Sequence, residues 1–149
     1  MLIAIGLKLS TVSALLEEFV WRGNIYYYLR KVFNFSATSF IISAIWSIWH
    51  LPIALLYKPY DQVVPVTLIY FALLFILSLV ICLFREKSGS VLPATIVHGP
   101  LNVFYLSDGL RMTVSVSEQE LVKLLVCFLV LIFCICYYTS KHKPLIKLT

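Results

Sequence analysis

The chain has 149 residues, of which 61% are hydrophobic and only 13% are charged. Soluble domains are about 45–50% apolar and about 25% charged, so the composition excludes an ordinary soluble protein and predicts an integral membrane protein. The net charge of +5 comes from basic residues near predicted helix ends, so it is not a nucleic-acid-binding signature.

Apolar stretches of about 20 residues, the length that spans a bilayer as a helix, recur along the chain. They predict an all-α fold, a polytopic bundle of about five membrane helices. The predicted spans are residues 8–29, 36–57, 64–84, 91–107 and 121–139. Because no repeat or long linker interrupts them, we expect residues 1–149 to form a single integral-membrane domain.

The basic residues outside the spans are distributed unevenly. Connections after the first, third and fifth spans hold most of them, namely Arg30, Lys31, Arg85, Lys87, Lys141, Lys143 and Lys147. By the positive-inside rule these connections are cytoplasmic. We therefore expect a multi-pass protein of the cell membrane with its N-terminus outside and its C-terminus in the cytoplasm.

The interior of the first predicted span carries three charged residues, Glu17, Glu18 and Arg22. A charge at the centre of a membrane helix costs roughly 2.5–3.5 kcal/mol, so it marks a functional site by default. Glu18 and Arg22 lie at i and i+4 on one helix face, which predicts a supporting ion pair. Glu17 points about 100° away and has no partner in its helix, and an unpaired carboxylate suits a general base. The alternative is a purely structural ion-pair cluster.

Two other predicted spans carry histidines, His50 in the second and His98, followed by Asn102, in the fourth. His98 and Asn102 share a helix face and suit the stabilisation of an oxyanion, with interhelical hydrogen bonding as the alternative. At 1.5 Å per residue, Glu17, His50 and His98 lie about 13, 12 and 15 Å from the outer helix ends. These groups are therefore expected at one level near the bilayer midplane. The third and fifth spans hold almost nothing polar, which predicts a lipid-facing scaffold.

Three sequence patterns occur in the order Glu17-Glu18-x-x-x-Arg22-Gly23, Trp46-x-x-x-His50-Leu51-Pro52 and His98-x-x-x-Asn102. Together, over residues 14–102, they resemble the CPBP family, also called the Abi family, of CAAX prenyl endopeptidases and bacteriocin-processing enzymes. The resemblance implies an intramembrane endopeptidase of the glutamate type. One position differs, because the second pattern usually begins with Phe and here begins with Trp46.

The resemblance also implies roles for individual residues. Glu17 and His50 would activate the attacking water, His98 and Asn102 would hold the oxyanion, and the ion pair of the first pattern would be structural. The implied substrate is a CAAX-like, bacteriocin-like or signalling peptide, cleaved at the membrane. Relatives usually have further membrane helices ahead of the Glu pair, so a short family member, a truncated product and a misassigned start are alternatives.

A metal is the main rival to this chemistry. Glu17, His50 and His98 could hold zinc with an open position, but no His-Glu-x-x-His pattern is present, and we expect no cofactor. The expected partners are a peptide or protein substrate and the lipid bilayer. We expect no nucleic-acid partner, and the sequence does not indicate the oligomeric state. The alternative function is a non-catalytic bacteriocin-immunity or regulatory membrane protein, and a transporter with a proton relay is a third reading.

Overall fold

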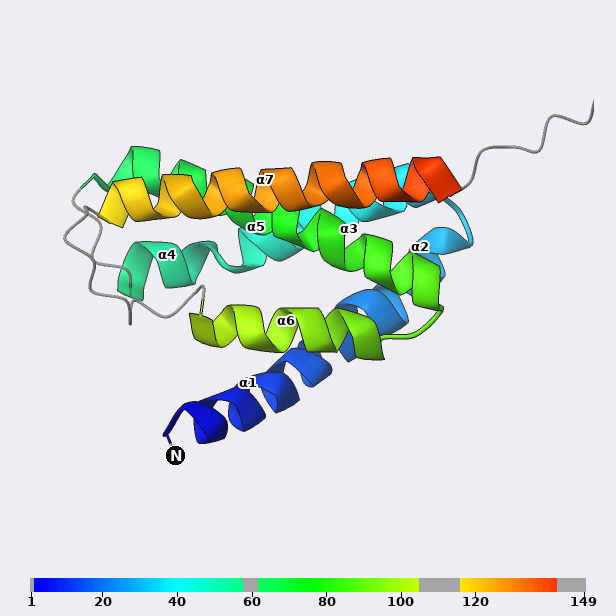
Figure 1. Ribbon diagram of the computed structural model, residues 1–149, viewed down its shortest axis with the longest axis horizontal. Helices are drawn as coiled ribbons and strands as arrows, with labels where there is room; N and C mark the ends of the chain where they lie inside the picture. Colours follow the sequence, from blue (N-terminus) through cyan, green and yellow to red (C-terminus); the bar gives the residue numbers. More distant parts are fainter. Residues whose placement is uncertain (1, 58–61, 105–115, 142–149) are drawn as a thin grey trace, which may run out of the picture.

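Helices make up almost all of residues 2–57, 62–104 and 116–141, which are the residues described by this computed structural model (Figure 1). Within those ranges no strand occurs, which confirms the all-α fold. Helices suit a membrane because they bond their own backbone groups. In chain order they are α1 (Leu2–Glu18), the π-helical η1 (Phe19–Ile25), α2 (Tyr26–Arg30), α3 (Phe35–Trp49), α4 (Leu51–Tyr57), α5 (Val63–Ser88), α6 (Leu92–Phe104) and α7 (Val116–Lys141).

The predicted spans correspond to α1–η1–α2, α3–α4, α5, α6 and α7. Residues 105–107 of the fourth prediction lie outside the described residues. Within the described ranges, three stretches could cross a membrane by length and apolar composition: Phe35–Leu56, Val63–Ser88 and Glu118–Tyr137. The remaining two helical stretches are the ones that carry the first and third sequence patterns.

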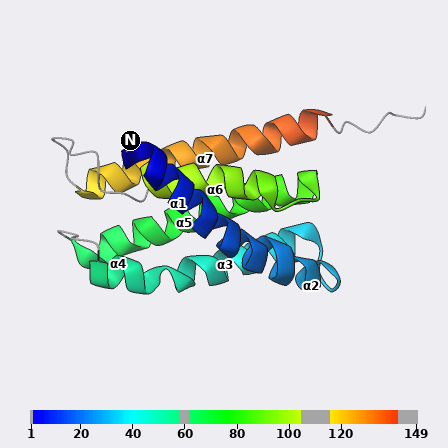
Figure 2. The same ribbon diagram turned by 90° about the horizontal axis from the view of Figure 1, so that it is seen from below.

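Helix α5 packs against α3, α6 and α7, whereas α1 packs mainly against α6. Figure 2 shows α1 running obliquely across the other helices, and Figure 1 shows α7 on the opposite side of the bundle. The main core joins Leu73, Leu74 and Ile81 of α5 to Trp46 of α3, all fully buried. The site described below lies beside this core, between α1, α3, α5 and α6.

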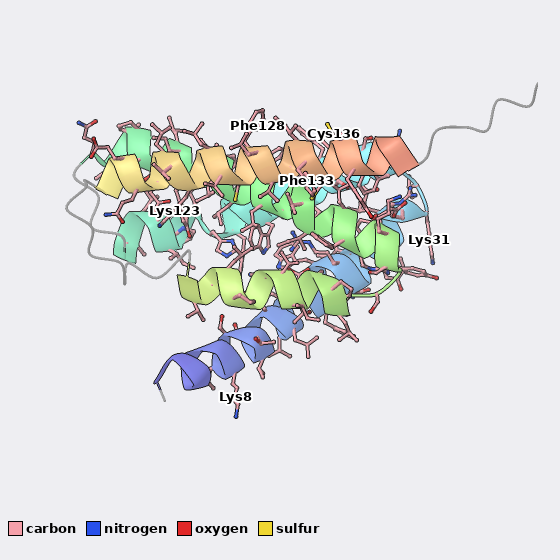
Figure 3. All side chains as sticks on the ribbon, in the orientation of Figure 1. Lys8, Lys31, Lys123, Phe128, Phe133 and Cys136 are labelled. Carbon is pink, nitrogen blue, oxygen red and sulfur yellow. The ribbon has the colours of Figure 1, made fainter. Side chains whose placement is uncertain are left out.

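The prediction that the third span is a lipid-facing scaffold is wrong. In α5, 56% of the most apolar segment is buried inside the bundle, whereas in α7 the buried share of that segment is 11%. Phe128 and Cys136 project from α7 away from the other helices (Figure 3), as expected of a helix that faces lipid. Core-facing and lipid-facing membrane helices are both apolar all round, so composition alone could not separate α5 from α7.

Gly89 ends α5 and allows the close turn into α6. Its φ of 66° lies in the left-handed region, which glycine adopts without the steric cost that a side chain adds. Its N–H donates to the Arg85 carbonyl over 3.1 Å. The turn brings α6, with the third sequence pattern, back along α5.

Candidate active site

Trp46 of α3 is fully buried and contacts residues from all three sequence patterns. Its indole Nε1–H donates to Oε2 of Glu17 over 3.3 Å. Its ring centroid lies 4.4 Å from that of His50 and 5.4 Å from that of His98. The guanidinium of Arg22 lies 5.1 Å from the same centroid. One side chain therefore joins segments that are far apart in the sequence.

Arg22 is a fully buried cation with partners on two helices. Its Nη1 donates to Oε1 of Glu18 over 3.0 Å, which confirms the predicted i, i+4 ion pair. Its Nη2 donates to Oγ of Ser78 on α5 over 2.6 Å. A buried ion pair is tolerated when further hydrogen bonds satisfy its charged groups, and Ser78 supplies one of them.

Glu18 also holds His98 of α6. The same Oε1 atom lies 2.8 Å from Nδ1 of His98, and both side chains are fully buried. An ionised carboxylate only accepts hydrogen bonds, so Nδ1 carries a proton. Nε2 of His98 is buried and has no hydrogen-bond partner among the described residues. This nitrogen is a lone-pair acceptor in the neutral ring and a donor in the imidazolium.

His50 lies at the break between α3 and α4. Pro52 has no N–H, and its ring crowds the carbonyl four residues earlier, so the helix is interrupted. The main-chain N–H of His50 donates to Ser47 over 3.2 Å, while its Nδ1 donates to the Trp46 carbonyl over 2.8 Å. In an unbroken α-helix that carbonyl would accept from the main-chain N–H. In the neutral ring, Nε2 is consequently the acceptor.

The chain turns π-helical directly after the Glu pair. Segment η1 contains Arg22, and the N–H of Tyr26 donates to the carbonyl of Trp21, five residues back. Such turns are rare and occur frequently at functional sites. The sequence predicted one helical span here, and the change of pitch within it carries no compositional signal.

Three of the four predicted catalytic residues, Glu17, His50 and His98, meet around the Trp46 ring. The fourth, Asn102, lies one turn beyond His98 on α6 and is partly exposed. The partner of Glu17 comes from another helix, where the spacing of the first pattern could not indicate it, because the indole of Trp46 donates to it. The roles of these residues stay predictions.

Sequence reasoning misses two members of the site, the shared indole of Trp46 and the hydroxyl of Ser78. Trp46 opens the second sequence pattern, and that position is the signal that could have identified it. Ser78 is a polar residue within an apolar stretch of α5. A polar group inside a membrane helix needs a partner, which here is Arg22.

The comparisons with known proteins agree with the three patterns. A family model described as "Type II CAAX prenyl endopeptidase Rce1-like" matches residues 1–104, which include every residue of the candidate site. No curated protein and no solved structure gave a significant match. The family match covers 104 of 149 residues and confirms the resemblance. By this match and the three patterns it contains, the chain belongs to the Rce1-like family of type II CAAX prenyl endopeptidases.

Proposed function

We propose that the chain is an intramembrane endopeptidase of the glutamate type. The observation that carries this proposal is the meeting of Glu17, His50 and His98 around one buried indole. Glu17 is partly exposed at the bundle surface, whereas Glu18 is fully buried. This difference suits a reacting carboxylate beside a supporting one.

In the proposed reaction, Glu17 takes a proton from a water molecule oriented by Nε2 of His50. The water oxygen forms a bond to the scissile carbonyl carbon, and the π electrons of the carbonyl move to its oxygen. Collapse of this intermediate breaks the C–N bond, and the leaving amine takes the proton held by Glu17. General acid–base catalysis of this kind contributes about 10²–10⁴-fold to the rate.

His98 and Asn102 stabilise the oxyanion in this proposal. Because Nδ1 of His98 donates to Glu18, Nε2 donates to the oxyanion only from the imidazolium. The imidazolium would then lie between the Glu18 carboxylate and the developing negative charge. Asn102, one turn further along α6, adds a neutral amide donor. Losing one such donor costs on the order of 10²–10³ in kcat.

The proposed reaction uses no metal ion. Among the described residues, no group of three or more His, Cys, Asp or Glu side chains is arranged to hold one. The competing proposal is zinc bound by Glu17, His50 and His98, with an open position for water. A chelator separates the two, because activity that is lost on chelation and restored by zinc would contradict the metal-free reaction.

The proposed location is the cell membrane, with several spans, the N-terminus outside and the C-terminus in the cytoplasm. An ion pair of 3.0 Å between Arg30 and Glu86 joins the ends of α2 and α5, so two basic connections lie at one end of the bundle (Figure 1). The positive-inside rule assigns that end to the cytoplasm.

Two exposed lysines allow this orientation to be tested, Lys8 on α1 and Lys31 beside α2 (Figure 3). In intact cells and a cysteine-free background, Lys8→Cys should react with a membrane-impermeant maleimide and Lys31→Cys should be protected. The reverse labelling would contradict the orientation.

The catalytic proposal is tested on purified protein in detergent with a peptide library, each peptide with and without a prenyl group. We expect Glu17→Ala and Glu17→Gln to abolish cleavage, and the control Glu118→Gln, at an exposed carboxylate on α7, to retain it. Cleavage at the wild-type rate by Glu17→Ala would make the assignment wrong. An immunity phenotype that survives both Glu17→Gln and His50→Ala would favour a binding function instead.

A further inference from the structure

Arg85 of α5 contacts the main chain of the first sequence pattern. Its Nε donates to the carbonyl oxygen of Arg22 over 2.8 Å. Its guanidinium also lies 5.5 Å from the ring centroid of Tyr26. Two turns earlier on α5, Ser78 accepts from the Arg22 side chain. Helix α5 therefore holds Arg22 by its side chain and by its carbonyl.

The π-helical turn explains why this carbonyl needs a partner from outside its helix. The N–H of Tyr26 donates to the carbonyl of Trp21, five residues earlier, and it ends the π-helical hydrogen bonding. In α2, which begins at Tyr26, each following N–H donates four residues back, past the carbonyl of Arg22. The return to regular pitch skips that carbonyl, and Arg85 satisfies it. Unbonded main-chain carbonyls are strongly disfavoured within a membrane.

A second set of contacts lies further from the site, where α2 meets the end of α5. The hydroxyl of Tyr26 donates to Oε2 of Glu86, and Nη2 of Arg30 donates to Oε1 of Glu86 over 3.0 Å. Arg30 lies two helical turns beyond Arg22, and its ion pair meets the π-helical turn only through the hydroxyl of Tyr26, not at the carbonyl of Arg22. The two arginines, Arg30 and Arg85, thus join the same helices at different distances from Glu17.

We propose that Arg85 is a positioning residue for the Glu17 carboxylate. By bonding the skipped carbonyl it stabilises the π-helical turn, and the turn sets the rotation of α1 relative to α2. Loss of the extra residue in this turn would rotate α1 by about 100° and carry Glu17 away from Trp46. The inference rests on the proposed function, in which Glu17 is the base.

The kinetic test compares Arg85→Met with the matched control Arg30→Met in the full-length protein. We expect kcat of Arg85→Met to fall by up to roughly 10²-fold, the effect of a displacement of about 1 Å, with little change in KM. Arg85→Lys keeps a cationic donor and should recover part of the loss. Arg30→Met should retain the wild-type kcat. Equal losses of kcat in both methionine variants would overturn the positioning role.

A second measurement does not depend on activity. The indole ¹⁵N–H resonance of Trp46, assigned with Trp46→Phe, reports its hydrogen bond to Glu17. We expect Arg85→Met to shift this resonance, Arg85→Lys to shift it less, and Arg30→Met to leave it unchanged. An unchanged resonance in folded Arg85→Met, or a larger shift in Arg85→Lys than in Arg85→Met, would overturn the inference. A wild-type protein without peptidase activity would contradict the proposed function, and this spectroscopic comparison would still decide the role of Arg85.

Discussion

Oε1 of Glu18 and Nδ1 of His98 lie 2.8 Å apart, in a contact that is fully buried between α1 and α6. The neighbouring carboxylate, Glu17, is partly exposed and accepts from Trp46 instead. Two adjacent acidic residues therefore have different partners on different helices. The buried one fixes a histidine and an arginine, and the accessible one is the proposed base.

Glu18→Gln is expected to reduce both stability and activity, because an amide cannot balance the charge of Arg22 or accept from His98 as a carboxylate does. Removing one partner of a buried ion pair costs about 3–5 kcal/mol, which thermal unfolding in detergent would measure. A double-mutant cycle with His98→Gln should give a coupling energy of about 0.5–3 kcal/mol. Strictly additive effects would contradict the contact between Glu18 and His98.

Trp46→Phe is expected to lower kcat, because the variant keeps an aromatic ring and loses the N–H that holds Glu17. A hydrogen bond to a charged group contributes about 1.5–3 kcal/mol, which corresponds to a fall of roughly 10–100-fold in rate. Trp46→Ala should also lose about 3–5 kcal/mol of stability, as large core truncations do. Peptide cleavage and thermal unfolding would be measured together, and a wild-type kcat in Trp46→Phe would show that the hydrogen bond has no role.

Gly99→Ala is expected to separate α1 from α6. A Cβ at Gly99 would lie 2.8 Å from Oγ1 and 3.0 Å from Cα of Thr11, and the main chain at that Cα cannot move aside alone. Gly23→Ala is the matched control, because its nearest contact would be an ordinary 3.6 Å to Val91. Thermal unfolding should show a clear loss for Gly99→Ala and little or none for Gly23→Ala. Equal stabilities would rule out the close approach of the two helices.

Ser78→Ala is expected to destabilise the protein, since it leaves Nη2 of the buried Arg22 without its 2.6 Å acceptor. An unsatisfied buried polar group costs about 1–3 kcal/mol, and more when it is charged. The control is Ser88→Ala, at an exposed serine near the end of the same helix. Chemical denaturation of both variants gives the comparison, and a smaller loss for Ser78→Ala would contradict the role of this hydroxyl.

Contacts within one helix could be predicted from the sequence. The spacing of Glu18 and Arg22 gave their ion pair, because side chains four residues apart on a helix are neighbours. The polar residues of three separate spans, among them Glu17, His50 and His98, indicated a common depth, and the structure places these three around one ring. Such groups are costly in a membrane, so their positions carry information that the apolar residues lack.

Contacts between helices could not be predicted in the same way. Nothing in the spacing of Glu17 indicates that Trp46 donates to it, because that bond depends on how α1 crosses α3. The burial of α5 was hidden because lipid and a bundle core select the same side chains. The π-helical turn contains Arg22, and the carbonyl of Arg22 accepts from Arg85, which lies 63 residues away in the chain.

The position of Trp46 also has a consequence for substitutions in the three sequence patterns. Because Glu17, His50 and His98 all contact one indole, a movement of α1 that breaks the Glu17 bond also disturbs the ring against which both histidines pack. The three patterns are therefore energetically coupled, and assembly of the site is cooperative. Substitutions in different patterns should have less than additive effects on activity, since the first displacement already disrupts the shared arrangement.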